Sequence, residues 1–271
     1  MIAGIGAFVL NDALVKHETA RISVAQIIFV RGIFATTFLV LVALAMRTRL
    51  ELREMMRPRV LSRAGLDALA SVTFITSLAH LPLANATAIN AATPLILSVM
   101  AVFVLREHVS FDRWTAIVCG FAGVMLIVQP SGDGFNSWSL LCVLATLLSS
   151  CRDFTTRLID RSVSPVTVAI SNAAVVMLLA GAWLHFKVWF PLSALDVLVL
   201  AAAGACMAAG YLLITIALRS GAISMVVPFR YTGLIFASVF GFLMWGELPN
   251  VIACLGMALL VGAGVYLTRR T

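Results

Sequence analysis

The sequence has very little charge. Only 11% of its 271 residues are Asp, Glu, Lys or Arg, and 62% are hydrophobic. Soluble domains carry about 25% charged residues and about 45–50% apolar residues. The composition therefore excludes an ordinary soluble domain and predicts a polytopic membrane protein.

Cysteine is scarce and is not arranged for chemistry. No two of the five cysteines form a CxxC pair, and all five stand in apolar runs, so we interpret them as small buried side chains. The sequence also lacks a P-loop, a glycine-rich phosphate cradle, a metal-ligand spacing and a nucleophile elbow. We therefore expect no cofactor, no bound metal, no enzymatic activity and no ATP-driven transport by this chain alone.

Long apolar runs are what the sequence has instead. A membrane-spanning helix needs roughly 20 mostly apolar residues, and charged or turn-forming residues divide the chain into ten such runs. The first run lacks a basic start, so we interpret it as a spanning helix rather than a cleaved signal peptide. The predicted spans are approximately 1–17, 22–46, 64–81, 84–105, 112–129, 136–158, 165–187, 194–218, 221–245 and 249–268.

The basic residues predict the orientation. If the N-terminus is inside, thirteen of the nineteen Lys and Arg fall in cytoplasmic connections or at the C-terminus, and three fall in the outer connections. Positive residues are enriched on the cytoplasmic side of membrane proteins, so both termini are expected in the cytoplasm. The net charge of +7 then faces anionic lipid headgroups rather than nucleic acid.

The two halves resemble each other at an offset of about 140 residues. Asp12 and Lys16 in the first span match Asp153 and Arg157 in the sixth, each an i,i+4 pair of an acid and a base. Such pairs lie on one helix face, and we expect each pair to neutralise itself.

This duplication predicts two domains, residues 1–130 and residues 136–271. Each holds five spans, and an odd number turns the second half upside down relative to the first. Inverted repeats are typical of secondary transporters, whose substrate site lies near the middle of the membrane. A duplicated channel or membrane enzyme remains an alternative.

Three segments resemble a known family. "LPLANATAINAATPLILSVMAVFVLREHVSFDRW", "PFRYTGLIFASVFGFLMWGELPN" and "VAQIIFVRGIFA" are similar to EamA repeats of the drug/metabolite transporter superfamily. The resemblance covers essentially the whole chain. It departs from the family at Arg106–Glu107, where the family has Gly-Glu, and at position 234, where no Pro stands opposite Pro94.

The resemblance implies an all-α membrane fold of ten helices in two inverted repeats. It implies a central cavity lined mainly by spans one, three, four, six, eight and nine. Members of the superfamily are mostly exporters of amino acids and other metabolites, and include YddG-type aromatic amino-acid exporters. Other branches take up S-adenosylmethionine or carry sugars.

Arg230 is a charge inside the ninth span, where a cation is costly and usually faces a cavity or a partner. The planar guanidinium of an arginine binds a carboxylate through two hydrogen bonds, so Arg230 is our first candidate for the polar end of a substrate. Packing between helices or snorkelling to the headgroups is the alternative for Arg230, and an ordinary structural role is the alternative for each other candidate. The predicted substrate-binding residues are Arg230, Asn90, Tyr231, Tyr211, Phe74, Ser77, His80 and Asn11.

A second set of charged residues is predicted to act in gating or coupling. A carboxylate in a low-dielectric environment holds its proton more tightly and can couple proton movement to transport. Self-neutralised helix ends are the alternative for the acids, and helix packing is the alternative for the arginine of the second span. The predicted gating or coupling residues are Asp12, Asp153, Arg152 and Arg31.

The sequence thus predicts a multi-pass transporter of the bacterial inner membrane that exports small metabolites by alternating access. Neutral and aromatic amino acids are the expected substrates, lipid is the expected surroundings, and one monomer is expected to form a complete pathway. The alternatives are an uptake carrier of the same fold, for example for S-adenosylmethionine, a channel, and a membrane-embedded enzyme acting on lipid.

Overall fold

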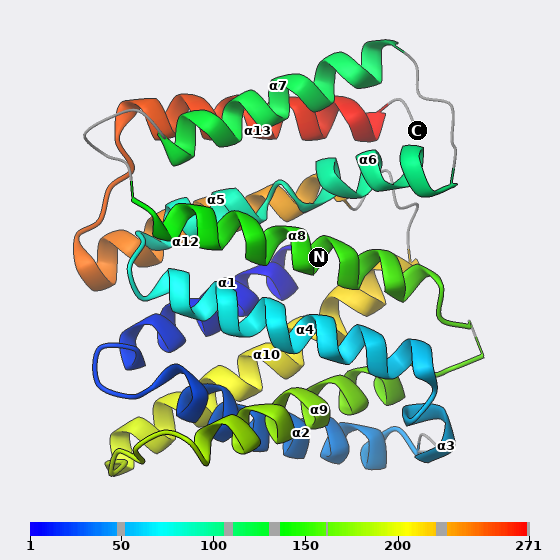
Figure 1. Ribbon diagram of the computed structural model, residues 1–271, viewed down its shortest axis with the longest axis vertical. Coiled ribbons are helices and arrows are strands. Elements are labelled where there is room, and N and C mark those ends of the chain that lie inside the picture. The colour runs from blue at the N-terminus through cyan, green and yellow to red at the C-terminus, as the bar shows by residue number, and fades with distance from the viewer. Residues whose placement is uncertain (48–51, 106–110, 130–135, 161, 221–226, 270–271) are drawn as a thin grey trace.

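The computed structural model describes all residues except 48–51, 106–110, 130–135, 161, 221–226 and 270–271. The described residues fold into helices that follow the ten predicted spans closely (Figure 1). The helices are α1 (Ile2–Glu18), α2 (Val24–Ala45), α3 (Leu52–Met55), α4 (Pro58–Leu78), α5 (Leu83–Asn90), α6 (Thr93–Leu105), α7 (Phe111–Val128), α8 (Trp138–Arg157), α9 (Pro165–Leu184), α10 (Ala194–Ser220), η1 (Val227–Tyr231), α12 (Thr232–Trp245) and α13 (Val251–Arg269).

Local chemistry sets several of the helix ends. Pro58 and Pro165 occupy the first positions of α4 and α9, where the missing amide hydrogen costs no helical hydrogen bond. The Ser23 hydroxyl accepts a hydrogen bond from the Gln26 amide at the start of α2. Gly246 ends α12 in the left-handed conformation, with φ 67°, which glycine adopts without a steric penalty.

Hydropathy and length mark the membrane character of these helices. Among the described residues, three helices are long and apolar enough to cross a membrane, and shorter apolar helices accompany them. The three are Val24–Ala45, Pro165–Leu184 and Ala194–Ile214; the shorter ones are Leu83–Leu97, Trp114–Val128, Phe229–Trp245 and Val251–Tyr266. Many large apolar side chains on outward faces are exposed, including Leu41, Leu178 and Leu198, as expected for a surface that contacts lipid.

The helix is interrupted part-way along two of the spans, and the two interruptions lie about 140 residues apart. The first break separates α5 from α6, and the second is the transition from η1 to α12. Pro94 has no amide hydrogen to donate to the Asn90 carbonyl, and the Thr93 hydroxyl donates to that carbonyl instead, at 2.7 Å. Broken helices with re-satisfied backbone groups are tolerated in membranes where protein surrounds them.

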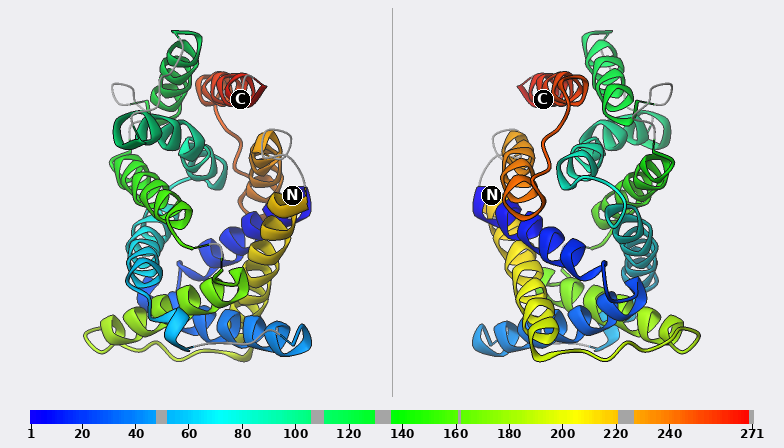
Figure 2. Two further views of the ribbon diagram at one scale, coloured as in Figure 1. Left: turned by 90° about the vertical axis from the view of Figure 1, so that its right-hand side faces the viewer. Right: turned by 90° about the vertical axis from the view of Figure 1, so that its left-hand side faces the viewer.

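The helices form two walls that stand on a common base (Figure 2). Helices α4, α8, α5 and α6 form one wall, α1, α10 and α12 form the other, and α2 packs on α9 in the base. The packing obeys a two-fold relation. Helix α1 packs on α10 and α12 as α8 packs on α4, α5 and α6, while α2 with α9, α5 with α12 and α7 with α13 are equivalents in contact. This is the pattern that two inverted five-helix halves produce.

Glycine lets α10 of the wall and α2 of the base meet closely. A Cβ at Gly204 of α10 would lie 2.9 Å from the Arg31 carbonyl oxygen and 2.9 Å from the Ala35 amide nitrogen of α2. Small residues permit such backbone contact between membrane helices. The close approach holds the middle of α2, and with it Arg31, against α10.

Candidate functional site

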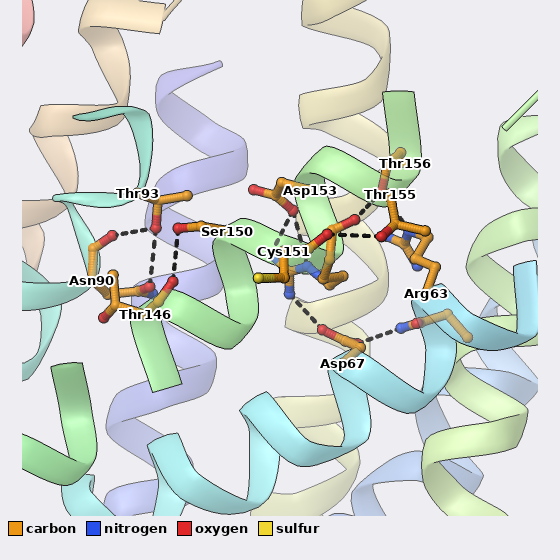
Figure 3. A network of polar contacts seen from close by, with 12 residues as sticks. Arg63, Asp67, Asn90, Thr93, Thr146, Ser150, Cys151, Asp153, Thr155 and Thr156 are labelled. Carbon is orange, nitrogen blue, oxygen red and sulfur yellow. Dashed lines mark hydrogen bonds and ion pairs between the residues drawn. The ribbon is translucent and has the colours of Figure 1, made fainter. Parts of the chain in front are cut away.

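A network of charged and polar side chains lies where the two walls meet the base (Figure 3). Its centre is Asp67 of α4, which is 4% exposed. Asp67 forms an ion pair with Arg152 of α8. It also accepts hydrogen bonds from the Asn172 Nδ2 of α9 at 2.5 Å and from the Tyr211 hydroxyl of α10 at 3.4 Å. One carboxylate thus joins four helices drawn from both halves of the chain.

Arg152 holds a second carboxylate. Its Nε and Nη2 lie 2.9 Å and 2.8 Å from the Asp153 Oδ1. Arg63, one turn before Asp67 on α4, donates from Nε to the Thr156 hydroxyl of α8 at 2.8 Å. A charge taken out of water must be paired and hydrogen-bonded to be tolerated. The ion pairs that join Arg152 to Asp67 and Asp153 meet that requirement, whereas the Arg63 Nη1 is buried without a hydrogen-bond partner among the described residues.

A second cluster joins α1 to α2. The Arg31 Nη1 donates to the Asn11 Oδ1 at 3.1 Å, and the Asn11 Nδ2 donates to the Asp12 Oδ1 at 2.9 Å. Arg31 is 5% exposed and Asn11 is 3% exposed. The Asp67 carboxylate also acts electrostatically on Arg31, so the two clusters are neighbours and we treat them as one polar site.

The site is balanced in charge. It contains three carboxylates and three guanidinium groups, which come from α1, α2, α4 and α8: Asp12, Asp67, Asp153, Arg31, Arg63 and Arg152. Ionised groups inside a membrane protein usually line a pathway or a binding site. A balanced set suits a ligand that carries both signs of charge or none.

An aromatic pair flanks the polar site. The rings of Phe8 on α1 and Tyr211 on α10 meet edge to face, with centroids 5.1 Å apart and planes at 84°. Gly210 makes room for this contact, because a Cβ there would lie 2.9 Å from the Phe8 ring.

Lys16 lies in the last turn of α1, whose end is at the left of Figure 1. Its ammonium lies 2.6 Å from the Glu247 Oε1 and 2.8 Å from the Leu81 carbonyl oxygen, and it sits 4.7 Å from the centre of the Trp245 ring. The other carboxylate oxygen of Glu247 accepts from the Leu83 amide at 3.0 Å. We call these contacts the Lys16 latch. They tie the end of α1 to the α4–α5 turn and to the α12–α13 loop.

A pocket of about 470 Å³ lies beside the Lys16 latch and is lined in part by Lys16, His80 and Trp245. The imidazole of His80 stacks on Trp138, with ring centres 3.9 Å apart, and its Nδ1 lies 3.0 Å from the Thr76 carbonyl oxygen. His80 therefore belongs to the latch end and not to the charged network.

The structure brings six of the predicted residues together. They come from both predicted sets, the substrate-binding one and the gating one, and all belong to the charged network: Asn11, Asp12, Arg31, Arg152, Asp153 and Tyr211.

The other predicted residues lie elsewhere. Asn90 ends α5, where its backbone carbonyl accepts from Thr93, as Figure 3 shows. The Ser77 hydroxyl donates to the carbonyl of half-buried Phe74 one turn earlier, at 2.8 Å. Arg230 and Tyr231 lie in η1, which packs on α13, α12 and α1.

Tyr231 packs tightly at that place. It is 5% exposed, and a Cβ at Gly264 of α13 would overlap its hydroxyl. Glu107, which stands 140 residues before Glu247 and so corresponds to it in the repeat, lies outside the described residues.

Sequence reasoning missed two central residues and misassigned one partner. Asp67 is the only acid in the predicted span 64–81, and that isolation was the available signal. The second is Asn172, which stands 141 residues after Arg31 in the repeat and binds Asp67. Lys16 was expected to pair with Asp12 on the same helix face, but it binds Glu247, 231 residues away. The long-range carboxylate accepts the ammonium in the folded chain.

Comparisons with known proteins agree with this architecture. The EamA-like transporter family matches residues 1–129 and again residues 136–270. A solved crystal structure superposes with a TM-score of 0.69 over 99% of this chain and 96% of that chain, at 18% identity. That likeness shows the fold.

Curated relatives are 22–30% identical to this chain over the aligned residues. The pseudopaline exporter CntI of Pseudomonas aeruginosa is 25% identical and aligns over 97% of this chain and 92% of its own length. The S-adenosylmethionine uptake transporter of Rickettsia bellii gives the same three values. The riboflavin transporter of Rhizobium johnstonii is 30% identical over 78% of this chain and 70% of its own length.

These matches overrule the alternative of a membrane-embedded enzyme, because the family and its named members are transporters of small metabolites. One family matches both halves of the chain, and relatives of that kind align along nearly its whole length. Together with the fold, these matches show that the chain belongs to the EamA-like transporter family, within the drug/metabolite transporter superfamily.

Proposed function

We propose that this protein is a secondary transporter that exports neutral and aromatic amino acids across the bacterial inner membrane by alternating access. The observation that carries the proposal is the charge-balanced polar site between the two walls, with an aromatic pair beside it. An amino acid has one charge of each sign and no net charge, so it matches a site in which both signs are present and equal.

Alternating access requires one end to close while the other opens. We propose that the repeats 1–130 and 136–271 rock against each other around the polar site, as in other inverted-repeat transporters. The basic connections predict that both termini lie in the cytoplasm, and in that orientation the Lys16 latch would close the outer end. One monomer contains both repeats and is sufficient for a pathway.

Counterflow in proteoliposomes tests this function. Vesicles loaded with one unlabelled amino acid are placed in a trace of the same labelled compound, with Phe, Trp, Met and Thr as the panel. We expect labelled Phe and Trp to accumulate transiently above equilibrium. Silence across the panel, with folded protein confirmed by a single symmetric size-exclusion peak, would contradict the amino-acid assignment and leave the family assignment intact.

Uptake of a larger metabolite is the second candidate. Its support is that four relatives from Rickettsia species, at 22–25% identity over at least 95% of this chain, are named S-adenosylmethionine uptake transporters. S-adenosylmethionine added to the counterflow panel separates the two substrates. Transport measured with a proton gradient of either sign then separates export from uptake.

A further inference from the structure

The three arginines of the polar site differ in how fully they are used. Arg152 binds two carboxylates. Arg63 is bonded to Thr156 and lies in the field of Asp67, although its Nη1 has no hydrogen-bond partner among the described residues. Arg31 donates to a neutral amide, and its Nε has no hydrogen-bond partner among the described residues although the side chain is 95% buried. A guanidinium has five N–H donors, so Arg31 retains strong capacity for an anion.

The three carboxylates differ in the same way. Asp67 accepts from Arg152, Asn172 and Tyr211, and Asp153 is bound by two nitrogens of Arg152. Within the described contacts, half-buried Asp12 accepts from Asn11 alone. A carboxylate has about four acceptor positions, so Asp12 retains capacity for a cation.

Asn11 connects the arginine and the aspartate that retain this capacity. Its oxygen accepts from Arg31 while its nitrogen donates to Asp12. The carboxylate and the ammonium of an α-amino acid present the same two functions, an acceptor beside a donor, and each carries a full charge. Charge-assisted hydrogen bonds are roughly twice as strong as neutral ones, so such a head group is expected to displace the Asn11 amide from Arg31 and Asp12.

The inverted repeat shows that this arrangement occurs in one half only. At an offset of 141 residues, Asn11 corresponds to Arg152, and Arg31 corresponds to Asn172. The second half therefore places an arginine at the bridging position, where it pairs directly with carboxylates. In the second cluster the arginine thus binds carboxylates directly, whereas in the first cluster a neutral amide stands between the arginine and the carboxylate.

The side chain of a ligand has a suitable neighbour. Phe8 precedes Asn11 by one turn of α1, so both lie on the same helix face. Its edge-to-face partner Tyr211 stands two turns after Gly204 of α10, which packs directly on the backbone of Arg31. The aromatic pair thus stands beside the two charged groups and offers an apolar surface for an aromatic or large apolar side chain.

From these contacts we infer that Arg31 and Asp12, bridged by Asn11 when no ligand is bound, form the binding site for the head group of an α-amino acid. Arg31 binds the carboxylate, Asp12 binds the ammonium, and Phe8 with Tyr211 packs against the side chain. This inference rests on the proposed function and names the residues that carry its specificity.

The test uses three ligands that differ by one charge: phenylalanine, phenylalaninamide, which lacks the carboxylate, and N-acetylphenylalanine, which lacks the ammonium. Each is titrated as a competitor of labelled phenylalanine counterflow. For the wild-type protein we expect each derivative to bind at least tenfold more weakly than phenylalanine, since each loses charge-assisted hydrogen bonds.

Two variants then assign each charge to its residue. Arg31→Gln is expected to weaken phenylalanine about 100-fold and to make it no better than phenylalaninamide. Asp12→Asn is expected to abolish the preference over N-acetylphenylalanine while the preference over the amide remains. Arg21→Gln is the matched control, because this arginine is 64% exposed and pairs with Asp196 outside the site; it is expected to leave all three affinities unchanged.

The outcomes separate the two proposals. If the wild-type protein shows no counterflow of any amino acid, both the proposed function and this site are overturned. If the wild-type protein transports phenylalanine but Arg31→Gln and Asp12→Asn both still prefer it over its two derivatives, the site is overturned and the proposed function stands. If a variant does not fold, the wild-type ligand series still decides, because equal affinity for phenylalanine and both derivatives contradicts a head-group site.

Discussion

The Lys16 latch gives the sharpest prediction about conformational change. Glu247→Gln keeps the size of the side chain and removes its charge. The amide of the variant still accepts from Leu83, but the ion pair with Lys16 at 2.6 Å is lost. Because the contacts of the latch join α1 to the α4–α5 turn and to the α12–α13 loop, their loss is expected to favour opening at that end.

The size of the effect follows from burial. Lys16 is 8% exposed and Glu247 is 27% exposed, so solvent weakens this pair less than a surface pair. Hydrogen bonds to charged groups contribute about 1.5–3 kcal/mol. A loss of that size multiplies the ratio of open to closed molecules by about 10- to 150-fold, since each ~1.4 kcal/mol is a factor of ten.

Cys142 reports the opening. It is 0% exposed, and its thiol lies 3.7 Å from the carbonyl oxygen of Ala86 on α5, the helix whose first residue is held by Glu247. With the other four cysteines replaced by serine, labelling by a membrane-impermeant maleimide is expected to be about 10- to 150-fold faster in Glu247→Gln.

A control and a rescue accompany this assay. Gln129→Ala breaks a 2.9 Å hydrogen bond to Asn250 at the same end without touching α1, and it is expected to leave the labelling rate unchanged. The charge exchange Lys16→Glu with Glu247→Lys is expected to restore slow labelling. Equal labelling of wild-type and Glu247→Gln protein, both folded, would refute the latch as a closing contact.

Three further changes follow from the packing and the site. Asp67→Ala removes one of the two ion pairs of Arg152 together with the hydrogen bonds from Asn172 and Tyr211, and is expected to lower the free energy of unfolding by about 1.5–3 kcal/mol, measured by thermal denaturation in detergent. Gly204→Ala is expected to destabilise the protein because its Cβ meets the backbone of α2, whereas Gly65→Ala, with no atom within 4 Å, is expected to raise stability by up to ~1 kcal/mol in the same assay.

The number and order of spans were predictable because hydropathy and charge act locally. Each span needs only its own apolar residues and the breaks that flank it. The break beside Pro94 was also predictable, since a missing amide hydrogen acts on the carbonyl four residues earlier. The internal repeat, with an odd number of spans in each half, predicted the inverted arrangement that the packing of α1 on α10 and of α8 on α4 displays.

The site was predictable only in part. The intramembrane charges Arg31, Arg152 and Asp153 stand out in an apolar sequence, and they do meet. Their partners do not follow from sequence spacing, because Asp67 binds residues 85, 105 and 144 positions away. Local spacing made Asp12 the expected partner of Lys16, but the fold brings Glu247 closer.

The central claim is that one charge-balanced site is exposed alternately to the two sides of the membrane. Counterflow of labelled phenylalanine into proteoliposomes loaded with unlabelled phenylalanine tests it most directly. The account predicts a transient accumulation of label above equilibrium, which decays as the internal pool mixes. Label that rises monotonically to equilibrium without an overshoot would indicate a channel and would contradict alternating access.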